Sequence, residues 1–581
     1  MFTTKKSNLL ASKPATAPQT TVTSVKAATA NPFILAAQGK QLQTTSGNGA
    51  TKLTTSGNPF VDQFSAVARY RNPRSFQEIS ADMLTLWQKN PYMTLLFVFY
   101  LRTITRITSL FNGEKTSVPQ RGQGLKHESI FRMLWLHVNA PDTFWKNIPY
   151  FIAVGSWKDI ITMLSYDLQW NGWNGRVLDW NKFSQLILAG LENPTQNNLL
   201  KKYLPQIKAN SKCTTLESQA DNIIAKWICS LCFGGKTQED NYKNYRAYRK
   251  LKTSGTAHEW QKLISRHQML KIDFKTIHGR ALSLLVSGKF LKNNHLEAKY
   301  AAWIAQQPVA KFTGYVYELV SNIKPSMQIY QKDTINKQFL ELVETAKKGL
   351  SNTGLRPISV LDASSSMNSH MYIGGGKVGP MRSIEVAMSS LIFFDAMIDE
   401  KSPFKNHYLQ FANTTQMNNL IGDNFVDRYL TSPRIGYGGT NFQSVFDFFA
   451  DFKRKNPLVD ESLIPNFIVC WSDGEFNSVS SSLTTNVQAG RKKLAKAGYS
   501  KEYCDSFGIC FVDLPNTFYS HRPTQKFETF ANAKNCFYFS GYDLAPLAFL
   551  FGASTSKIIP QTAEELFDIA MDQEIFKKLS L

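Results

Sequence analysis

The sequence predicts a multidomain protein in which an all-α region of stacked helices precedes an α/β domain with a mostly parallel sheet. Residues 59–350 place apolar side chains three and four positions apart, which is typical of helices. From residue 355 onwards, short apolar runs alternate with amphipathic stretches, which is typical of a sheet with helices on both faces. A chain of 581 residues also exceeds what one hydrophobic core usually organises.

The segment before the helices, residues 1–58, has the composition of a disordered basic arm. It is rich in Thr, Ser, Ala, Gln and Gly, and it contains six Lys but no Asp or Glu. Such a segment buries too little apolar surface to offset the conformational entropy that is lost on ordering. We therefore expect no regular structure before residue 59.

Residues 59–350 are expected to form many short helices joined by short turns. Apolar positions with helical spacing occur in Ile79–Leu86, Ile130–Val138, Phe144–Val154, Ile160–Leu164, Leu186–Leu191, Ile223–Cys232 and Ala281–Leu285. No fixed repeat length emerges, so the predicted stack of helical pairs is irregular. The most apolar stretch, Tyr92–Leu101, is too short to span a membrane, and we expect a buried helix and no membrane partner.

The α/β domain is expected to span residues 355–560 and to be doubly wound, in the manner of a Rossmann fold. Its predicted strands are Arg356–Asp362, Asn466–Asp473, Phe507–Leu514 and Cys536–Ser540. Its predicted helices are Ile384–Asp399, Phe442–Phe452, Val487–Ala497 and Leu544–Phe551. Residues 561–581 are expected to form a C-terminal helix that can pack back onto the helical region.

Charge and cysteine content narrow the class of partner and the compartment. The chain has 66 Lys and Arg against 44 Asp and Glu, a net charge of +22, which favours polyanionic partners and nucleic acid first. Seven cysteines without the spacing of a disulfide framework suit a reducing compartment, and we expect a cytoplasmic protein. The nine His are scattered and form no helical metal-binding pair, so we expect no catalysis.

The residues with the clearest chemistry follow the predicted strands. Asp362, Ser364 and Ser366 form a D-x-S-x-S motif directly after one buried strand, and Asp473 ends another. Thr440 follows two glycines in a loop that opens a helix. These two carboxylates and three hydroxyls are hard oxygen donors that suit Mg²⁺, or Mn²⁺ or Ca²⁺. The neutral hydroxyls leave the cation an open position, which a carboxylate or phosphate oxygen of a partner could complete. Ser and Thr at helix starts are often only caps, but here all five residues occur together.

This motif resembles the metal-ion-dependent adhesion site of von Willebrand factor A domains, and the resemblance covers residues 355–560. It implies the A-domain fold and a cation held by Asp362, Ser364, Ser366, Thr440 and Asp473.

The helical region is similar to the TROVE module, which telomerase, Ro and vault proteins share. The resemblance rests on Gly122–Gly124, Ile130–Arg132, Ile148–Tyr150 and the turn Gly155–Ile160. In Ro-type proteins an A domain follows this module, and the resemblance implies a ring of HEAT-like repeats closed against that domain. The chain is most similar to an uncharacterised TROVE-like plus A-domain family. An I-D-Y-x-x-V-P-S-x-A element of that family is matched loosely by Ile272–Phe274 and Ile277–Ala281, although His278 and Gly279 depart from it.

A basic segment between residues 236 and 292 is the candidate RNA surface. It holds nine Lys and four Arg against two Asp and two Glu, with Tyr, Trp and Phe between them. Cations for phosphates and rings for unpaired bases are typical of single-strand RNA surfaces, whereas the alternative is a solvated helix whose rings face the core. The candidate RNA-binding residues are Arg246, Tyr248, Arg249, Lys250, Lys252, Arg266, Lys271, Lys275 and Arg280.

The sequence thus predicts an RNA-binding protein that resembles Ro-type ribonucleoprotein components and carries a divalent-cation site. Its expected partners are small structured or single-stranded RNAs. The alternative is a metal-dependent protein-interaction scaffold without an RNA role, in which the A domain grips a partner's carboxylate. The basic arm also leaves a virus-particle component open.

Overall fold

The structure is a computed structural model of the whole chain. It describes residues 43–45, 51–53, 56–67, 74–106, 110–111, 114–115, 120–171, 177–234, 238–254, 258–277, 279–312, 314–347, 353–371, 381–432, 437–474, 476–477, 485–514, 534–540, 545–552 and 560–581.

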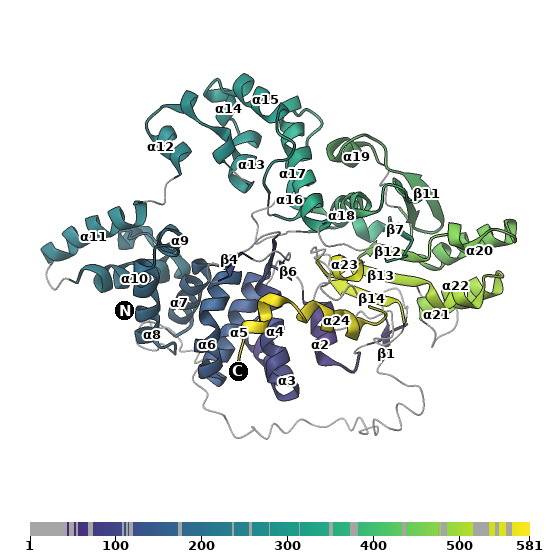
Figure 1. Cartoon of the computed structure of the whole chain (residues 1–581), viewed down its shortest axis with the longest axis horizontal. Coiled ribbons are helices and arrows are strands. Elements are labelled where there is room, and N and C mark those ends of the chain that lie inside the picture. Colours follow the sequence, from purple (N-terminus) through teal and green to yellow (C-terminus); the bar gives the residue numbers. More distant parts are fainter. Residues whose placement is uncertain are drawn as a thin grey trace.

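The part of the chain before residue 350 is mainly helical, and the α/β domain follows it (Figure 1). The helices before residue 350 are α2 (Pro59–Ala66), α3 (Phe76–Lys89), α4 (Pro91–Arg102), α5 (Lys126–Asn139), α6 (Pro141–Val154), α7 (Trp157–Asn171), α8 (Trp180–Glu192), α9 (Asn197–Tyr203), α10 (Leu216–Phe233), α11 (Gln238–Thr253), α12 (Glu259–Ser265), α13 (Gly279–Ser287), α14 (Phe290–Asn293), α15 (Glu297–Ala305), α16 (Val316–Val320) and α17 (Ile329–Lys347). Two short ladders interrupt them, β3 (Ile104–Arg106) with β6 (Gln120–Gln123) and β4 (Leu110–Phe111) with β5 (Glu114–Lys115). All seven segments with helical apolar spacing lie inside helices.

The most apolar stretch is a buried helix, as the sequence predicts. Tyr92–Leu101 falls within α4, and the side chains from Leu95 to Leu101 are buried. Among the described residues, no helix combines the length and the apolarity that a membrane span requires.

The α/β domain contains a six-stranded mixed sheet. Its strands are β7 (Pro357–Asp362), β10 (His407–Phe411), β11 (Thr415–Asn419), β12 (Phe467–Ser472), β13 (Gly508–Asp513) and β14 (Cys536–Ser540). Their order across the sheet is β11-β10-β7-β12-β13-β14, and only the β10–β11 pair is antiparallel. Counted along the domain, this is the order 3-2-1-4-5-6 of doubly wound sheets. The four predicted strands are therefore confirmed, whereas β10 and the polar edge strand β11 were not predicted.

Helices cover both faces of the sheet, because alternate side chains of each buried strand enter different cores. One face packs against α20 (Gln443–Lys455), α21 (Asn486–Lys496) and α22 (Lys501–Ser506). The other face packs against α18 (Ser383–Met397), α23 (Ala545–Leu550) and α24 (Ala563–Met571). A short helix, α19 (Phe425–Thr431), and a small ladder of β8 (His370–Met371) with β9 (Met381–Arg382) complete the domain.

The C-terminal segment joins the α/β domain to the helical region. The ring of Phe64 in α2 lies 5.5 Å from that of Phe567 in α24 and 6.1 Å from that of Phe539 in β14. Beyond α24, the Gln573 side chain exchanges hydrogen bonds of 3.0 and 2.9 Å with the backbone of Arg121. One hydrophobic core is consequently shared by the first helices and one face of the sheet.

The structure corrects part of the prediction of a disordered arm. Within residues 1–58, β1 (Gln43–Thr45) and β2 (Thr51–Leu53) form an antiparallel pair, so the expectation of no regular structure is wrong there. Two runs of three residues without apolar periodicity carry no strand signal of their own. Most of the rest of the arm lies outside the described residues.

Candidate metal centre and basic surface

The predicted metal-binding residues meet where the strand order of the sheet reverses. Asp362 is the last residue of β7, and Asp473 directly follows β12, the parallel neighbour of β7. Connections leave β7 and β12 toward opposite sides of the sheet, and in doubly wound sheets ligands bind outside the carboxyl ends of the strands at this point. The topology therefore brings the two carboxylates, which are separated by more than a hundred residues, to one edge.

Hydrogen bonds hold the Asp362 carboxylate and the turn after it in place. The side chain is fully buried. Its Oδ1 accepts a 2.9 Å bond from the Ser364 backbone N–H, and its Oδ2 accepts a 2.5 Å bond from the Ser472 hydroxyl. The hydroxyls of Ser364 and Ser366 lie 3.0 Å apart. The three members of the D-x-S-x-S motif thus present oxygens from a single tight turn.

The loop that carries Thr440 is fastened to the same edge. Ser365 and Gly438 exchange 3.2 Å hydrogen bonds, and the Asn477 backbone N–H donates to the Thr440 carbonyl at 3.0 Å. Gly438 has a φ of +99°, and a Cβ there would lie 2.8 Å from the Asn413 amide nitrogen, so this close approach requires glycine. Thr440 itself is buried. The supporting contacts of Ser365 and Asn413 were not anticipated, because nothing in the sequence places these loops together.

The electrostatics of this edge favour a cation. Burial, and then the negative charge of Asp473, raise the pKa of Asp362 to about 7. Among the described residues, no Lys, Arg or His forms an ion pair with Asp362. The same part of the chain holds no cluster of three or more His, Cys, Asp or Glu side chains that suits a metal. A cation here would consequently rely on two carboxylates and on the neighbouring hydroxyls.

The predicted RNA-binding residues fall into two groups, and the first is exposed. Arg246, Arg249 and Lys250 project from α11 into solvent. The guanidinium carbon of Arg246 lies 4.9 Å from the ring centre of Tyr242, whose side chain is 61% exposed. Further along the chain, the exposed members are Arg266, Lys271, Lys275 and Arg280. Arg280 forms a 2.9 Å ion pair with Glu318.

The second group, Tyr248 and Lys252, contributes to the packing of the helical region. The RNA-binding role predicted for Tyr248 is wrong. Tyr248 is fully buried, and its hydroxyl donates a 2.9 Å hydrogen bond to the Pro205 carbonyl, so its ring cannot stack on a base. Lys252 is half-buried, its Nζ donates to the Leu204 carbonyl, and burial lowers its pKa. The spacing of Tyr245, Tyr248 and Leu251 is the missed signal, because apolar residues three apart mark the core side of a helix.

One family model matches the α/β domain, and one solved structure is similar to the chain over most of its length. A family model described as a domain of unknown function (DUF7788) matches residues 356–567. No match was found among curated proteins. The chain is similar to the crystal structure of the Deinococcus radiodurans RO (RSR) protein, at 11% identity and a TM-score of 0.34, over 87% of this chain and 100% of that one.

Proposed function

We propose that the α/β domain binds a divalent cation and, through it, an anionic oxygen of a partner. Two buried carboxylates at adjacent strand ends, with no cation paired to Asp362 among the described residues, carry this proposal. A divalent ion would offset the charge of the buried Asp362 together with that of Asp473 beside it.

The proposed donors are Asp362, Ser364, Ser366, Thr440 and Asp473. Mg²⁺ is the first choice, with Mn²⁺ and Ca²⁺ as alternatives, because all five donors are hard oxygens. Neutral hydroxyls make up most of the set, so the bound ion keeps Lewis acidity for an additional oxygen ligand. Carboxylate and phosphate oxygens of a partner both have the required charge.

The first prediction is that Asp473→Asn weakens Mg²⁺ and Mn²⁺ binding by at least about tenfold, since it removes one of two anionic donors. Isothermal titration calorimetry of the full chain measures this. Asp423→Asn is the matched control, because Asp423 is an exposed carboxylate of the same domain outside the site. Equal cation affinity in the two variants would show that Asp473 is not a metal ligand.

RNA binding by the exposed cations of α11 is a second proposed function. Arg246, Arg249 and Lys250 are free of ion pairs with any described residue, so they are available to phosphates. Tyr242 takes the place of Tyr248 as the candidate ring for an unpaired base, because its side chain is exposed. The Ro-type resemblance of the sequence points to small structured or single-stranded RNA.

The second prediction concerns these cations. Changing Arg246, Arg249 and Lys250 together to Gln should flatten the slope of log affinity against log salt by roughly two to three units, because each phosphate contact adds about 0.7–0.9. Changing Lys455, Lys492 and Lys496 to Gln is the control, because it removes the same charge from exposed positions of the α/β domain. Filter binding at several salt concentrations measures both. Identical slopes in the two triple variants would exclude RNA binding by α11.

Tyr242→Ala separates stacking from phosphate contact. If the ring stacks on a base, affinity for single-stranded RNA should fall by about 1–3 kcal/mol while the salt slope stays unchanged. The two proposed functions are also separable, since RNA binding weakens with salt, whereas an anion held through the metal is lost when EDTA removes the cation.

A further inference from the structure

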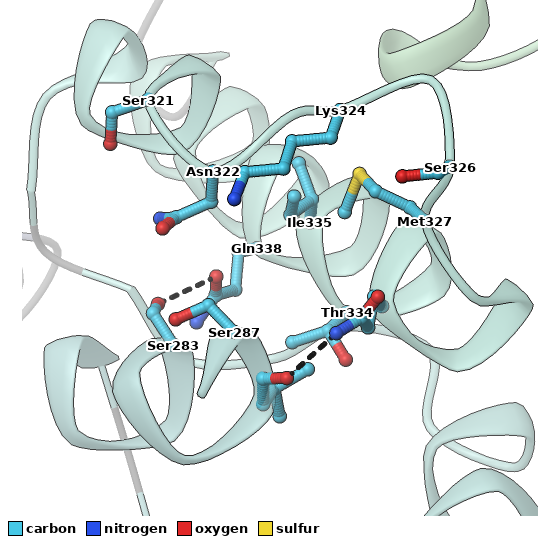
Figure 2. A pocket seen from close by; sticks show the side chains of 12 residues that line it. Ser283, Ser287, Ser321, Asn322, Lys324, Ser326, Met327, Thr334, Ile335 and Gln338 are labelled. Carbon is cyan, nitrogen blue, oxygen red and sulfur yellow. Dashed lines mark hydrogen bonds between the residues drawn. The ribbon is translucent and has the colours of Figure 1, made fainter. Parts of the chain in front are cut away.

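A polar pocket lies in the helical region, away from the edge of the sheet that carries Asp362 and Asp473. It opens between α13, the segment after α16 and the first half of α17, and its volume is about 310 Å³. This volume is at the lower end of the range of small-molecule pockets, roughly 300–1,000 Å³. The lining residues come from three segments, residues 283–287, 321–327 and 331–338, that only the tertiary structure brings together (Figure 2).

Hydroxyl and amide groups dominate the wall of this pocket. Four of its twelve lining residues are Ser, and Asn322, Gln331 and Gln338 add side-chain amides. Gln338 is fully buried, and its Oε1 accepts a 3.1 Å hydrogen bond from the Ser283 hydroxyl, which fixes the orientation of both groups. Val286 and Ile335 supply a small apolar floor. None of these twelve residues is aromatic, so they offer a nucleobase no stacking surface.

Lys324 is the one charged residue among the twelve that line the pocket. Figure 2 shows its side chain extending over the pocket, with Nζ toward Asn322 and Gln338. No ion pair joins Lys324 to any described carboxylate. A single ammonium above a wall of hydroxyls and amides is suited to a ligand with one anionic group and several hydroxyls.

We propose that this pocket binds a phosphorylated sugar. Lys324 pairs with the phosphate, while the serine hydroxyls and the amide of Asn322 hydrogen-bond the sugar hydroxyls. The ligand has two conceivable sources, a free sugar phosphate or the phosphorylated terminal ribose of a nucleic acid, and both present the same chemistry.

Calorimetric titration of the full chain with ribose 5-phosphate, ribose and inorganic phosphate tests this inference. Ribose 5-phosphate should bind at least about tenfold more tightly than either fragment, because only the intact molecule engages both Lys324 and the hydroxyl wall. Lys324→Gln should weaken ribose 5-phosphate by about tenfold or more, since a charge-assisted hydrogen bond is lost, and should leave ribose unaffected. A competing oligonucleotide with a 5′-phosphate, set against the same oligonucleotide without it, distinguishes the two sources.

Two further variants keep the test decisive. Lys292→Gln is the charge-matched control, because Lys292 is exposed on the neighbouring α14 and does not line the pocket. Ser287→Trp fills the pocket from an exposed position, so the variant should melt like the wild-type chain and lose the ligand. The proposal is overturned if ribose 5-phosphate does not bind, if inorganic phosphate binds equally well, or if Lys324→Gln and Lys292→Gln behave alike.

Discussion

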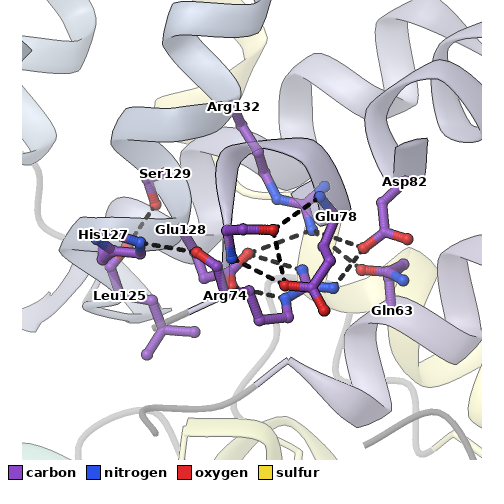
Figure 3. A network of polar contacts seen from close by, with 10 residues as sticks. Gln63, Arg74, Glu78, Asp82, Leu125, His127, Glu128, Ser129 and Arg132 are labelled. Atoms are coloured by element: carbon purple, nitrogen blue, oxygen red, sulfur yellow. Dashed lines mark hydrogen bonds and ion pairs between the residues drawn. The ribbon is translucent and has the colours of Figure 1, made fainter. Parts of the chain in front are cut away.

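Replacing Glu128 by alanine should lower the free energy of unfolding by about 3–5 kcal/mol, because the change leaves buried guanidinium groups without their carboxylate. Glu128 lies in α5 and is 5% exposed. Its two oxygens accept bonds of 2.9 and 2.8 Å from Nε and Nη2 of Arg74, and Nη2 of the fully buried Arg132 lies 3.6 Å away (Figure 3). Asp82 lies 2.5 Å from Arg74 and 4.0 Å from Arg132, and this single carboxylate cannot neutralise both cations.

Urea denaturation measures this effect, with Glu192→Ala as the control. Glu192 is an exposed residue at the end of α8, and its removal should change stability by no more than about 0.5 kcal/mol. Equal midpoints for the two variants would show that the Arg74–Glu128 pair contributes nothing.

The same carboxylate gives the stability a defined pH dependence. Burial alone would raise the pKa of Glu128, but the charge of Arg74 and its hydrogen bonds outweigh burial and lower the pKa below the ordinary 4.5. A depressed folded-state pKa means that this stabilisation is complete above about pH 4.5 and is lost as the pH falls through the folded value. The Glu128→Ala variant should therefore lose less stability on acidification than the wild-type chain.

Replacing Asp159 by alanine should cost a similar amount, about 3–5 kcal/mol, for the same physical reason. Asp159 is fully buried, its Oδ2 accepts a 2.8 Å hydrogen bond from Nε of the buried Arg102, and Nη2 of Arg102 forms an ion pair with Oδ2 at 2.7 Å. Oδ2 also accepts a 2.9 Å bond from the Ser156 backbone N–H, immediately before α7. The variant thus leaves the buried Arg102 guanidinium without its carboxylate. It also removes the hydrogen-bond acceptor of the Ser156 backbone N–H at the start of α7.

Two comparisons define the Asp159 experiment. Asp142→Ala is the control, because Asp142 is exposed in the first turn of α6 and contributes at most about 1 kcal/mol there. Asp159→Asn keeps the shape without the charge and should fall between the control and the alanine variant. Thermal melts in which Asp159→Ala matches Asp142→Ala would contradict the buried ion pair.

This pair also explains the turn from Gly155 to Ile160 that carries the TROVE resemblance. A Cβ on Gly155 would collide with the Asp159 carboxylate, so the glycine is required by the ion pair beside it. The Trp157 side chain is buried, and its indole N–H donates a 3.0 Å bond to Gln196. The turn is therefore a structural junction between α4, α7 and the loop before α9.

Local patterns in the sequence determined the elements of the fold and the five proposed metal-binding residues. Helical spacing located helices such as α5 and α10, and buried apolar runs located β7 and β12. Because parallel strands end at one edge, Asp362 and Asp473 were predictable as neighbours without any knowledge of packing. Strands with weak local patterns, β1, β2, β10 and β11, were missed.

Only the tertiary structure decided which side of a helix meets the core and which distant segments meet each other. The mixture of cations and aromatic rings in α11 does not tell which side of this helix faces the core. Packing against the segment around Pro205 buries Tyr248 and leaves Tyr242 exposed. The Arg74–Glu128 pair and the Lys324 pocket join side chains that lie tens of residues apart in the sequence. Such contacts depend on which helices pack against each other, and this packing of distant segments produces no periodic pattern in the sequence.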